Sequence, residues 1–341
     1  MTHSAQRSSP RLNHSPHPLC THNLLSAELI ASGSLENRYL HDVDAELEAV
    51  AAHLLALDCS GRRMGGAIRR TFDMLLDGQH TGRFRWEQLH KTEKTHCGTL
   101  VEINLQREFD FADGEILDYS IANAEVDCKF SQKLAEWMIP PEAVGGLVLG
   151  LWANDFAGKW SAGLVRTTAE NLNSGKNRDA KRTLSQRGRS AIRWLFKDAP
   201  LQANILLHLP PQDIDAIFRS AAGQKRVNEL FRRLQGRPIS RNVVATVAMQ
   251  EDYMKRVRGN GGARTTLRDE GIVIFGQYQR HSEIALALGL PPIGPGESMS
   301  VRLARRRPHH EGAASAAIDG ERWVVAGSSD PPERAPLLPR I

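Results

Sequence analysis

The stretch "DYSIANAEVDCK", residues 118–129, decides the fold that this sequence predicts. Its residues alternate with a period of two, so Val126 and Cys128 face one side of a strand while the charged residues between them face the other. Ala122-Asn123 suits a two-residue turn, because asparagine tolerates the positive φ that such turns need. The stretch therefore predicts a β-hairpin with one apolar and one charged face.

The charged face of this hairpin needs a cation. With a turn at Ala122-Asn123, Asp118 lies directly opposite Asp127. Cross-strand partners are about 5 Å apart at Cβ, and like charges placed there destabilise a sheet. Lys129 is one candidate for the positive partner, and a divalent cation is the other.

A helix that precedes the hairpin is expected to bring a third carboxylate. The apolar pattern is helical from Thr92 to Phe109, and Glu102 shares a stripe with Leu105 and Phe109. A lone acid is rarely buried without a partner. We therefore expect Glu102 to converge with the two aspartates of the hairpin.

Three converging carboxylates favour a metal site. Each acid holds its proton more tightly beside the others, and Mg²⁺ reverses this cost because hard cations take oxygen ligands. Mg²⁺ also accepts phosphate oxygens and can polarise a phosphodiester. Lys129 can orient the attacking water or stabilise the charge of the transition state. The pattern indicates a metal-dependent phosphodiesterase, and a structural hairpin with a Lys–Asp salt bridge is the alternative.

Length and composition predict two domains in an intracellular protein. The chain has 341 residues, and no apolar run is long enough to span a membrane. Residues 1–41 are poor in large apolar groups and predict a disordered tail. The four cysteines are far apart and show no CxxC spacing, which fits a reduced cytoplasm better than disulfides or a zinc site.

The order of helices, hairpin and later apolar runs predicts an α/β fold. We expect a nuclease domain over residues 42–172 and a polar linker over 173–199. A second, mostly helical domain follows over 200–327. The proline-rich segment 328–341 is expected to trail over the surface.

The second domain has the pattern of a winged helix-turn-helix. Three short helical patterns come first, and Ser240 can cap the second of them. The glycine-rich "GNGGART" and the strand-like "GIVIFG" follow. Any three-helix bundle could show the first part of this pattern.

This second domain is also basic. Residues 219–268 hold twelve Lys and Arg against three acids, and nucleic acid is the commonest polyanionic partner. A solvated basic surface is the alternative. The candidate DNA-binding residues are Lys225, Arg241, Lys255, Arg256, Arg258 and Arg264.

One stretch suggests a different enzyme. "LLDGQHTGR", residues 75–83, is similar to the K-x-D-G motif of nucleotidyl-transferring DNA ligases, but Leu75 stands at the position of the nucleophilic lysine. Leucine has no amine that could form the covalent adduct. Leu75 instead continues the apolar stripe of Ile68 and Phe72, so we predict a core residue.

Longer motifs resemble a known family. Asp118 followed by Asp127-Cys128-Lys129 matches the PD-(D/E)xK nuclease pattern, although Leu117 stands where the general pattern has proline. The chain resembles the NaeI-type restriction endonucleases over roughly residues 42–341. The stretches that carry the resemblance are "WEQLHKTEKTHCGTLVEINLQREF" (86–109), "RVNELFRR" (226–233) and "YMKRVRGNGGAR" (253–264).

This resemblance implies a fold, a reaction and partners. The fold would be a restriction-endonuclease-like mixed sheet flanked by helices, followed by a winged-helix domain. The family's likeness implies a homodimer that cuts double-stranded DNA with Mg²⁺ at the palindrome GCCGGC. It also implies a second bound DNA copy as activator, the type IIE mode. Glu102, Asp118, Asp127 and Lys129 would be the catalytic set, with the three acids as metal ligands.

Two other functions remain open from the sequence. A nuclease of DNA repair or recombination would use the same chemistry. A non-catalytic DNA-binding regulator would use the winged-helix domain alone, and its acidic hairpin would then be structural.

Overall fold

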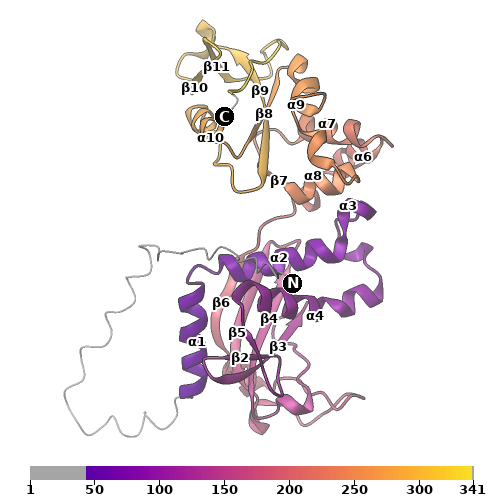
Figure 1. Cartoon of the computed structure of the whole chain (residues 1–341), viewed down its shortest axis with the longest axis vertical. Helices are drawn as coiled ribbons and strands as arrows, with labels where there is room; N and C mark the ends of the chain where they lie inside the picture. The colour runs from indigo at the N-terminus through magenta and orange to yellow at the C-terminus, as the bar shows by residue number, and fades with distance from the viewer. Residues whose placement is uncertain (1–43, 340–341) are drawn as a thin grey trace, which may run out of the picture.

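The hairpin lies inside a six-stranded mixed sheet of the computed structural model, which describes residues 44–339 (Figure 1). The strands lie in sequence order, and β3 and β4 are parallel while every other neighbouring pair is antiparallel. The strands are β1 (Ala112–Asp113), β2 (Tyr119–Ile121), β3 (Ala124–Ser131), β4 (Leu147–Asn154), β5 (Lys159–Arg166) and β6 (Arg193–Pro200). The predicted α/β class and mixed sheet are confirmed.

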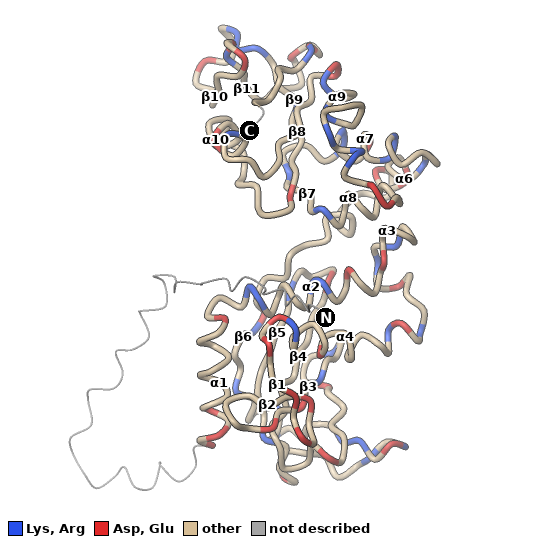
Figure 2. Tube along the Cα trace, viewed as in Figure 1, with Lys and Arg blue, Asp and Glu red and all other residues tan. Residues whose placement is uncertain are grey.

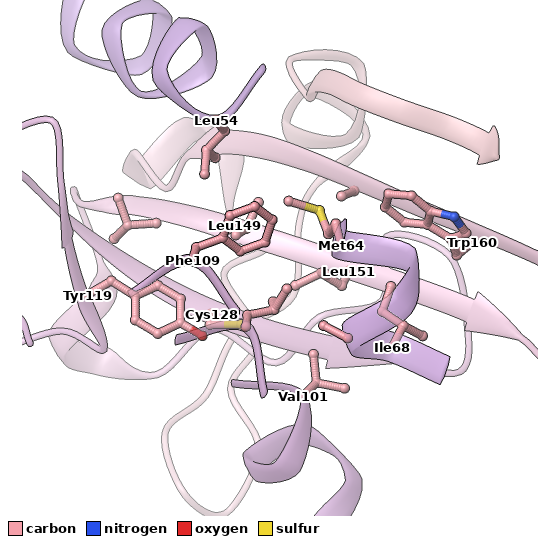
Figure 3. Packing of buried hydrophobic residues seen from close by; sticks show 14 of the residues in the cluster. Leu54, Met64, Ile68, Val101, Phe109, Tyr119, Cys128, Leu149, Leu151 and Trp160 are labelled. Atoms are coloured by element: carbon pink, nitrogen blue, oxygen red, sulfur yellow. The ribbon is translucent and has the colours of Figure 1, made fainter. Parts of the chain in front are cut away.

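Three helices cover one face of this sheet. Apolar side chains of the helices and of β3, β4 and β5 form one core, and Figure 3 shows Leu54, Met64 and Val101 gathered over Leu149 and Leu151 of β4. The helices of this part of the chain are α1 (Ala45–Leu57), α2 (Arg62–Leu76), α3 (Gly78–Thr81) and α4 (Lys91–Phe109), and α1, α2 and α4 form the covering layer. The helix predicted from Thr92 to Phe109 is therefore confirmed as α4.

The turn of the hairpin has the predicted geometry. Ala122 and Asn123 have φ angles of 52° and 64°, the left-handed values that a two-residue turn requires. Tyr119 pairs with Val126 across β2 and β3. The next pair in the same register joins Asp118, which lies just before β2, to Asp127. The sequence thus predicted the register that brings two aspartates together.

The opposite face of the sheet is covered by the chain that follows β3. A Cβ on Gly150 would lie 2.5 Å from the Trp137 ring, so only glycine permits this close approach. The indole of Trp137 donates to the Leu151 carbonyl at 2.8 Å. Gly150 is the register partner of Lys129 in β3. This layer therefore packs beside the charged face of the hairpin.

The structure differs from the prediction for residues 173–199. Strand β6 pairs with β5 as the edge strand of the six-stranded sheet, and α5 (Gln186–Ser190) precedes it. Leu184 and Ile192 are buried in the layer around Trp137. Polar residues surround Leu184 and Ile192 in the sequence, so the composition of this segment predicted a linker. Residues 44–200 therefore form the N-terminal domain.

The C-terminal domain holds a second sheet of five strands. Its order is β10-β11-β9-β7, and β8 also pairs with β9. The strands are β7 (Ile239–Ser240), β8 (Ile272–Gly276), β9 (Glu297–Arg305), β10 (Ser315–Ile318) and β11 (Glu321–Val325). The helices are α6 (Pro211–Phe218), α7 (Gly223–Arg233), α8 (Arg241–Ala248), α9 (Ala263–Thr266) and α10 (Gln279–Ala287).

Short 3₁₀ helices complete the connections. They are η3 (Trp86–Gln88), η4 (Pro141–Ala143), η5 (Ala169–Asn171), η6 (Ile205–His208), η7 (Tyr253–Arg256), η8 (Leu267–Glu270) and η9 (Pro308–His310). The three predicted helical segments of the second domain correspond to α7, α8 and η7, and Ser240 caps α8 as expected. The winged-helix arrangement itself stays a prediction. All residues from Val243 to Ala248 are buried, whereas a recognition helix needs an exposed face.

The proline-rich C-terminal segment is packed rather than trailing over the surface. Ala335 is 1% exposed. Its backbone N–H donates to the Arg268 carbonyl, and its carbonyl accepts a hydrogen bond from Arg268 Nε. Leu338 packs against the apolar cluster of the second sheet. The apolar residues between the prolines therefore anchor this segment. The predicted tail over 1–41 lies outside the described residues.

The two domains meet at α3, which lies against α8 (Figure 1). A Cβ on Gly78 would lie 2.1 Å from the Thr246 hydroxyl, so the helices are in very close contact. Phe84 follows α3 and stacks on Phe218 at 5.7 Å between ring centroids. Leu75 is 6% exposed, as predicted for a core residue. Among residues 44–339, none of the helices combines the length and apolar character of a membrane span.

Candidate active site

Three of the four predicted catalytic residues meet at the charged face of the hairpin. The Lys129 ammonium lies 2.7 Å from Asp127 Oδ1 and 3.5 Å from Asp118 Oδ2. It also donates to the Cys128 carbonyl at 2.9 Å. The backbone N–H of Cys128 donates to Asp118 Oδ2 at 2.7 Å. The lysine is therefore held between two carboxylates, one from β3 and one from the residue directly before β2.

Asp127 is the most constrained member of this group. Its side chain is buried, and Oδ2 has no hydrogen-bond partner among the described residues. Burial raises the pKa of Asp127 to about 6, against the opposing effect of Lys129, and the negative charge of Asp118 raises it further. A buried carboxylate oxygen without a partner is costly. A cation or a hydrogen-bond donor placed at Asp127 Oδ2 would therefore stabilise the site.

Glu102 approaches the same site from α4. The Tyr119 hydroxyl donates to the Glu102 backbone carbonyl at 2.8 Å, which ties the helix to β2. Burial raises the pKa of the half-buried Glu102 carboxyl, the negative charge of Asp118 raises it further, and Lys129 opposes both. Glu102 thus belongs to the helix segment that is bonded to β2, and the charges of Asp118 and Lys129 act on its carboxyl group. The predicted convergence of helix and hairpin is therefore seen in the structure, while the catalytic roles stay a prediction.

A second group of possible metal ligands lies outside the hairpin. His309, His310 and Asp330 are the group of three within the described chain whose ligand atoms all lie within 4.8 Å of one another. His310 Nδ1 accepts the Arg307 N–H at 3.0 Å, so the proton of a neutral ring is on Nε2, which lies 3.0 Å from Asp330. That nitrogen offers no lone pair to a metal. We interpret this group as a hydrogen-bonded structural contact.

Glu125 is a functional candidate that the sequence reading missed. Its carboxylate accepts the backbone N–H groups of Glu115, Ile116 and Leu117 at 2.6, 3.0 and 2.7 Å. These backbone donors, Leu117 first, lower the pKa of Glu125 and keep it charged. Asp118 comes directly after this loop. Glu125 lies two residues before Asp127 on the charged face of the hairpin. This position in the sequence could have identified Glu125 as a positioning residue.

Replacing Glu125 tests this role. In Glu125→Gln the amide nitrogen cannot accept the N–H groups that one carboxylate oxygen accepted, so the loop before Asp118 loosens. We expect kcat for DNA cleavage to fall about 10- to 100-fold with KM little changed, because small misplacements of reacting groups cost that much. Glu115→Gln is the matched control, since only the backbone of Glu115 takes part in these contacts. Equal kcat values for the two variants would contradict the positioning role.

The predicted DNA-binding residues separate into two places. Gln224 of α7 donates to the Arg256 carbonyl at 2.8 Å, and the N–H of Arg264 donates to the Val257 carbonyl at 3.3 Å, so η7 packs beside α7 and α9. Arg241 instead lines the cleft against Arg69 and Asp73 of the N-terminal domain. Figure 2 shows Lys and Arg along α7 and α9. Of the predicted residues near these elements, Lys225, Lys255 and Arg258 have exposed side chains.

Part of the basic charge of this region is structural. Arg226 is buried and donates to the carbonyls of Val247 and Ala248. Arg232 pairs with Glu270 at 2.7 Å, and Arg233 pairs with Asp213 at 2.5 Å. The count of twelve Lys and Arg between residues 219 and 268 therefore exceeds the number available to a polyanion.

Comparison with known proteins assigns the chain to a family. The sequence model of a family described as "Restriction endonuclease NaeI" matches residues 48–333. The chain is also 49% identical over 306 residues to "Type II restriction enzyme NaeI" of Lentzea aerocolonigenes, covering 87% of this chain and 95% of that protein. These matches span both domains and favour an enzyme over a non-catalytic regulator. The chain therefore belongs to the NaeI restriction endonuclease family, and it is a site-specific endonuclease that acts on double-stranded DNA.

Proposed function

We propose that this endonuclease cuts DNA through a PD-(D/E)xK site made of Glu102, Asp118, Asp127 and Lys129, with Mg²⁺ held by the three acids. The observation that carries this proposal is the buried Oδ2 of Asp127, which has no partner among residues 44–339 although a lysine and a second aspartate lie beside it. Such an arrangement is typical of a site completed by a ligand.

The residues fit a hard divalent cation, which restriction endonucleases generally use. All three acids offer oxygen, the ligand type that Mg²⁺ prefers. Asp127 Oδ2 is uncommitted, and only Oδ2 of Asp118 has a hydrogen-bond partner in the described chain. When bound, Mg²⁺ would supply the positive charge that polarises the phosphodiester.

Lys129 supplies the fixed positive charge of the protein itself. Its ammonium is held in place by Asp127 and by the Cys128 carbonyl, so it needs no reorganisation when negative charge develops on the phosphate. The same ammonium can donate a hydrogen bond that orients an attacking water. The carboxylates hold the lysine charged, because their negative charges, that of Asp127 above all, outweigh burial and raise its pKa.

The remaining details rest on the likeness to NaeI-type enzymes. We propose a homodimer, since a two-fold symmetric protein matches a palindromic site, and GCCGGC as that palindrome. The C-terminal domain, proposed to be of the winged-helix type, would bind a second copy of the site as activator. The exposed Lys225, Lys255 and Arg258 support phosphate contacts there, with Arg256 and Arg264 beside them and Arg241 at the domain cleft.

A digest tests the proposed reaction. The purified full chain is incubated with two plasmids that differ only in the presence of GCCGGC, once with Mg²⁺ and once with EDTA. We expect discrete fragments from the plasmid with the site and only in Mg²⁺. Cleavage in EDTA would contradict the metal, and equal cleavage of both plasmids would contradict the assigned site.

Activation by a second site makes a separate prediction. If two copies of the site must be bound together, a plasmid with one copy is cut slowly, while a plasmid with two copies is cut at least about ten-fold faster, because the second copy binds at high effective concentration. Adding a short duplex that carries the site should accelerate cutting of the one-copy plasmid. Equal rates on both plasmids, with no response to the duplex, would show a single-site enzyme.

A further inference from the structure

We infer that the C-terminal domain contains a binding site for a single nucleotide, in a cavity between α9, β8 and the C-terminal segment. The cavity has a volume of about 590 Å³, and Arg264, Arg268, Ile274, Tyr278 and Leu337 are among the residues that line it. Small-molecule sites in proteins commonly enclose about 300–1,000 Å³. The cavity is therefore large enough for a mononucleotide, and it is separate from the nuclease site.

Two guanidinium groups give this cavity its chemical character. Arg264 Nε donates to the Ile274 carbonyl at 3.0 Å, and Arg268 Nε donates to the Ala335 carbonyl at 2.8 Å. Each guanidinium is thus anchored through Nε, and its terminal nitrogens have no hydrogen-bond acceptor within residues 44–339. Within residues 44–339 no carboxylate pairs with either arginine, whereas Arg334 at the rim pairs with Asp269 at 3.0 Å. Preorganised guanidinium groups bind phosphate in a bidentate manner.

Among the described residues that line the cavity none is acidic, and His281 adds no negative charge. His281 accepts the Gly276 N–H on Nδ1 at 3.0 Å and lies with Nε2 3.2 Å from the Pro339 carbonyl, which is the pattern of a neutral ring. Burial and the nearby charge of Arg264 lower the pKa of His281, in agreement with that assignment. Within residues 44–339 the cavity therefore carries two arginines without an acidic partner, and an anion is the ligand that its electrostatics favour.

The rest of the cavity favours a flat apolar body attached to that anion. Ile274 and Leu337 contribute apolar walls, and the Tyr278 ring lies 5.8 Å from the guanidinium carbon of Arg264. Aromatic rings beside arginines are typical stacking partners of nucleobases. A nucleotide would place its phosphate on the two arginines and its base against Tyr278 and the apolar walls. A nucleotide could come from the free pool or from a bound DNA strand, and only the second source rests on the proposed effector role.

Titration calorimetry on the full chain tests the site. The probes are dGMP, deoxyguanosine without phosphate, and inorganic phosphate. We expect one dGMP per chain, with the other two probes at least about ten-fold weaker. Arg264→Gln and Arg268→Gln should each weaken dGMP about 10- to 100-fold, the effect of losing a hydrogen bond to a charged group. Tyr278→Leu, which keeps both arginines, should weaken it several-fold.

Arg280→Gln is the matched control, because Arg280 is exposed on α10 and does not line this cavity. The inference is overturned if wild type does not bind dGMP, if phosphate binds as tightly as dGMP, or if the cavity variants bind like the control. Competition between dGMP and a short duplex identifies DNA as the source, and simultaneous binding identifies a free nucleotide. Cleavage of GCCGGC plasmids by wild type is measured separately, so failure of the cavity and failure of the proposed function are distinguishable.

Discussion

Asp127→Asn is expected to lower DNA cleavage about 10²- to 10⁴-fold while leaving the metal-free protein at least as stable as wild type. Cleavage falls because the variant loses a carboxylate ligand of the proposed Mg²⁺ site, and such charge stabilisation contributes several kcal/mol to a phosphoryl transition state. Stability does not fall, because the substitution removes a buried charge and its repulsion with Asp118. Digestion rates and melting temperatures in EDTA measure the two effects.

The dependence on pH gives this prediction a sign. Burial raises the pKa of Asp127 from 3.8 to about 6, so between these values the folded protein holds a proton that the unfolded chain releases. This group therefore makes wild type more stable as pH falls from about 6 toward 4, and less stable above 6. The advantage of Asp127→Asn in melting temperature should be largest near pH 8 and shrink below pH 6. Cleavage by wild type should decline over the same interval as Asp127 becomes protonated.

An exposed aspartate provides the control for Asp127. Asp179→Asn changes the same functional group on the surface and should alter neither cleavage nor the pH profile. If Asp127→Asn melts below wild type at pH 8 in EDTA, the carboxylate is a stabilising partner of Lys129 rather than a strained ligand.

Local sequence determined the part of the site that could be predicted. The alternation of residues 124–130 and the turn at Ala122-Asn123 involve neighbours in the chain, so they define the register that joins Asp118 to Asp127. The helical stripe through Leu105 and Phe109 fixed the face of α4 in the same way. Because these patterns are local, the convergence of helix and hairpin followed from them.

Contacts between distant residues account for what the sequence reading missed. Strand β6 joins the sheet only through its pairing with β5, and Ala335 packs through its contacts with Arg268. Neither segment has a strong period, so composition suggested a linker and a loose tail. The sequence predicted Arg241 to be a DNA-binding residue beside the others. The packing of α3 on α8 instead places Arg241 in the cleft between the two domains. Tertiary contacts, rather than propensity, decided all three cases.

Lys129→Met is expected to lower cleavage about 10²- to 10³-fold and, unlike Asp127→Asn, to destabilise the metal-free protein. Cleavage falls because the developing charge on the phosphate loses a fixed partner, which is the effect seen when one preorganised donor is removed. Stability falls because Asp118 and the buried Asp127 lose the cation that lies 3.5 and 2.7 Å from them. Melting temperatures in EDTA and plasmid digests measure both consequences.

The double variant separates a strained catalytic site from a simple salt bridge. In Asp127→Asn/Lys129→Met the unpaired buried charge is gone, so this protein should melt above Lys129→Met alone, and adding Mg²⁺ should raise the melting temperature of Lys129→Met but not of the double variant. A simple salt bridge predicts the reverse: Asp127→Asn and Lys129→Met lose similar stability, and both still cut DNA. Asp127→Asn leaves Lys129 paired with Asp118, whereas Lys129→Met leaves two unpaired carboxylates. A metal site that the lysine assists therefore requires that both variants lose cleavage but that they differ in melting temperature.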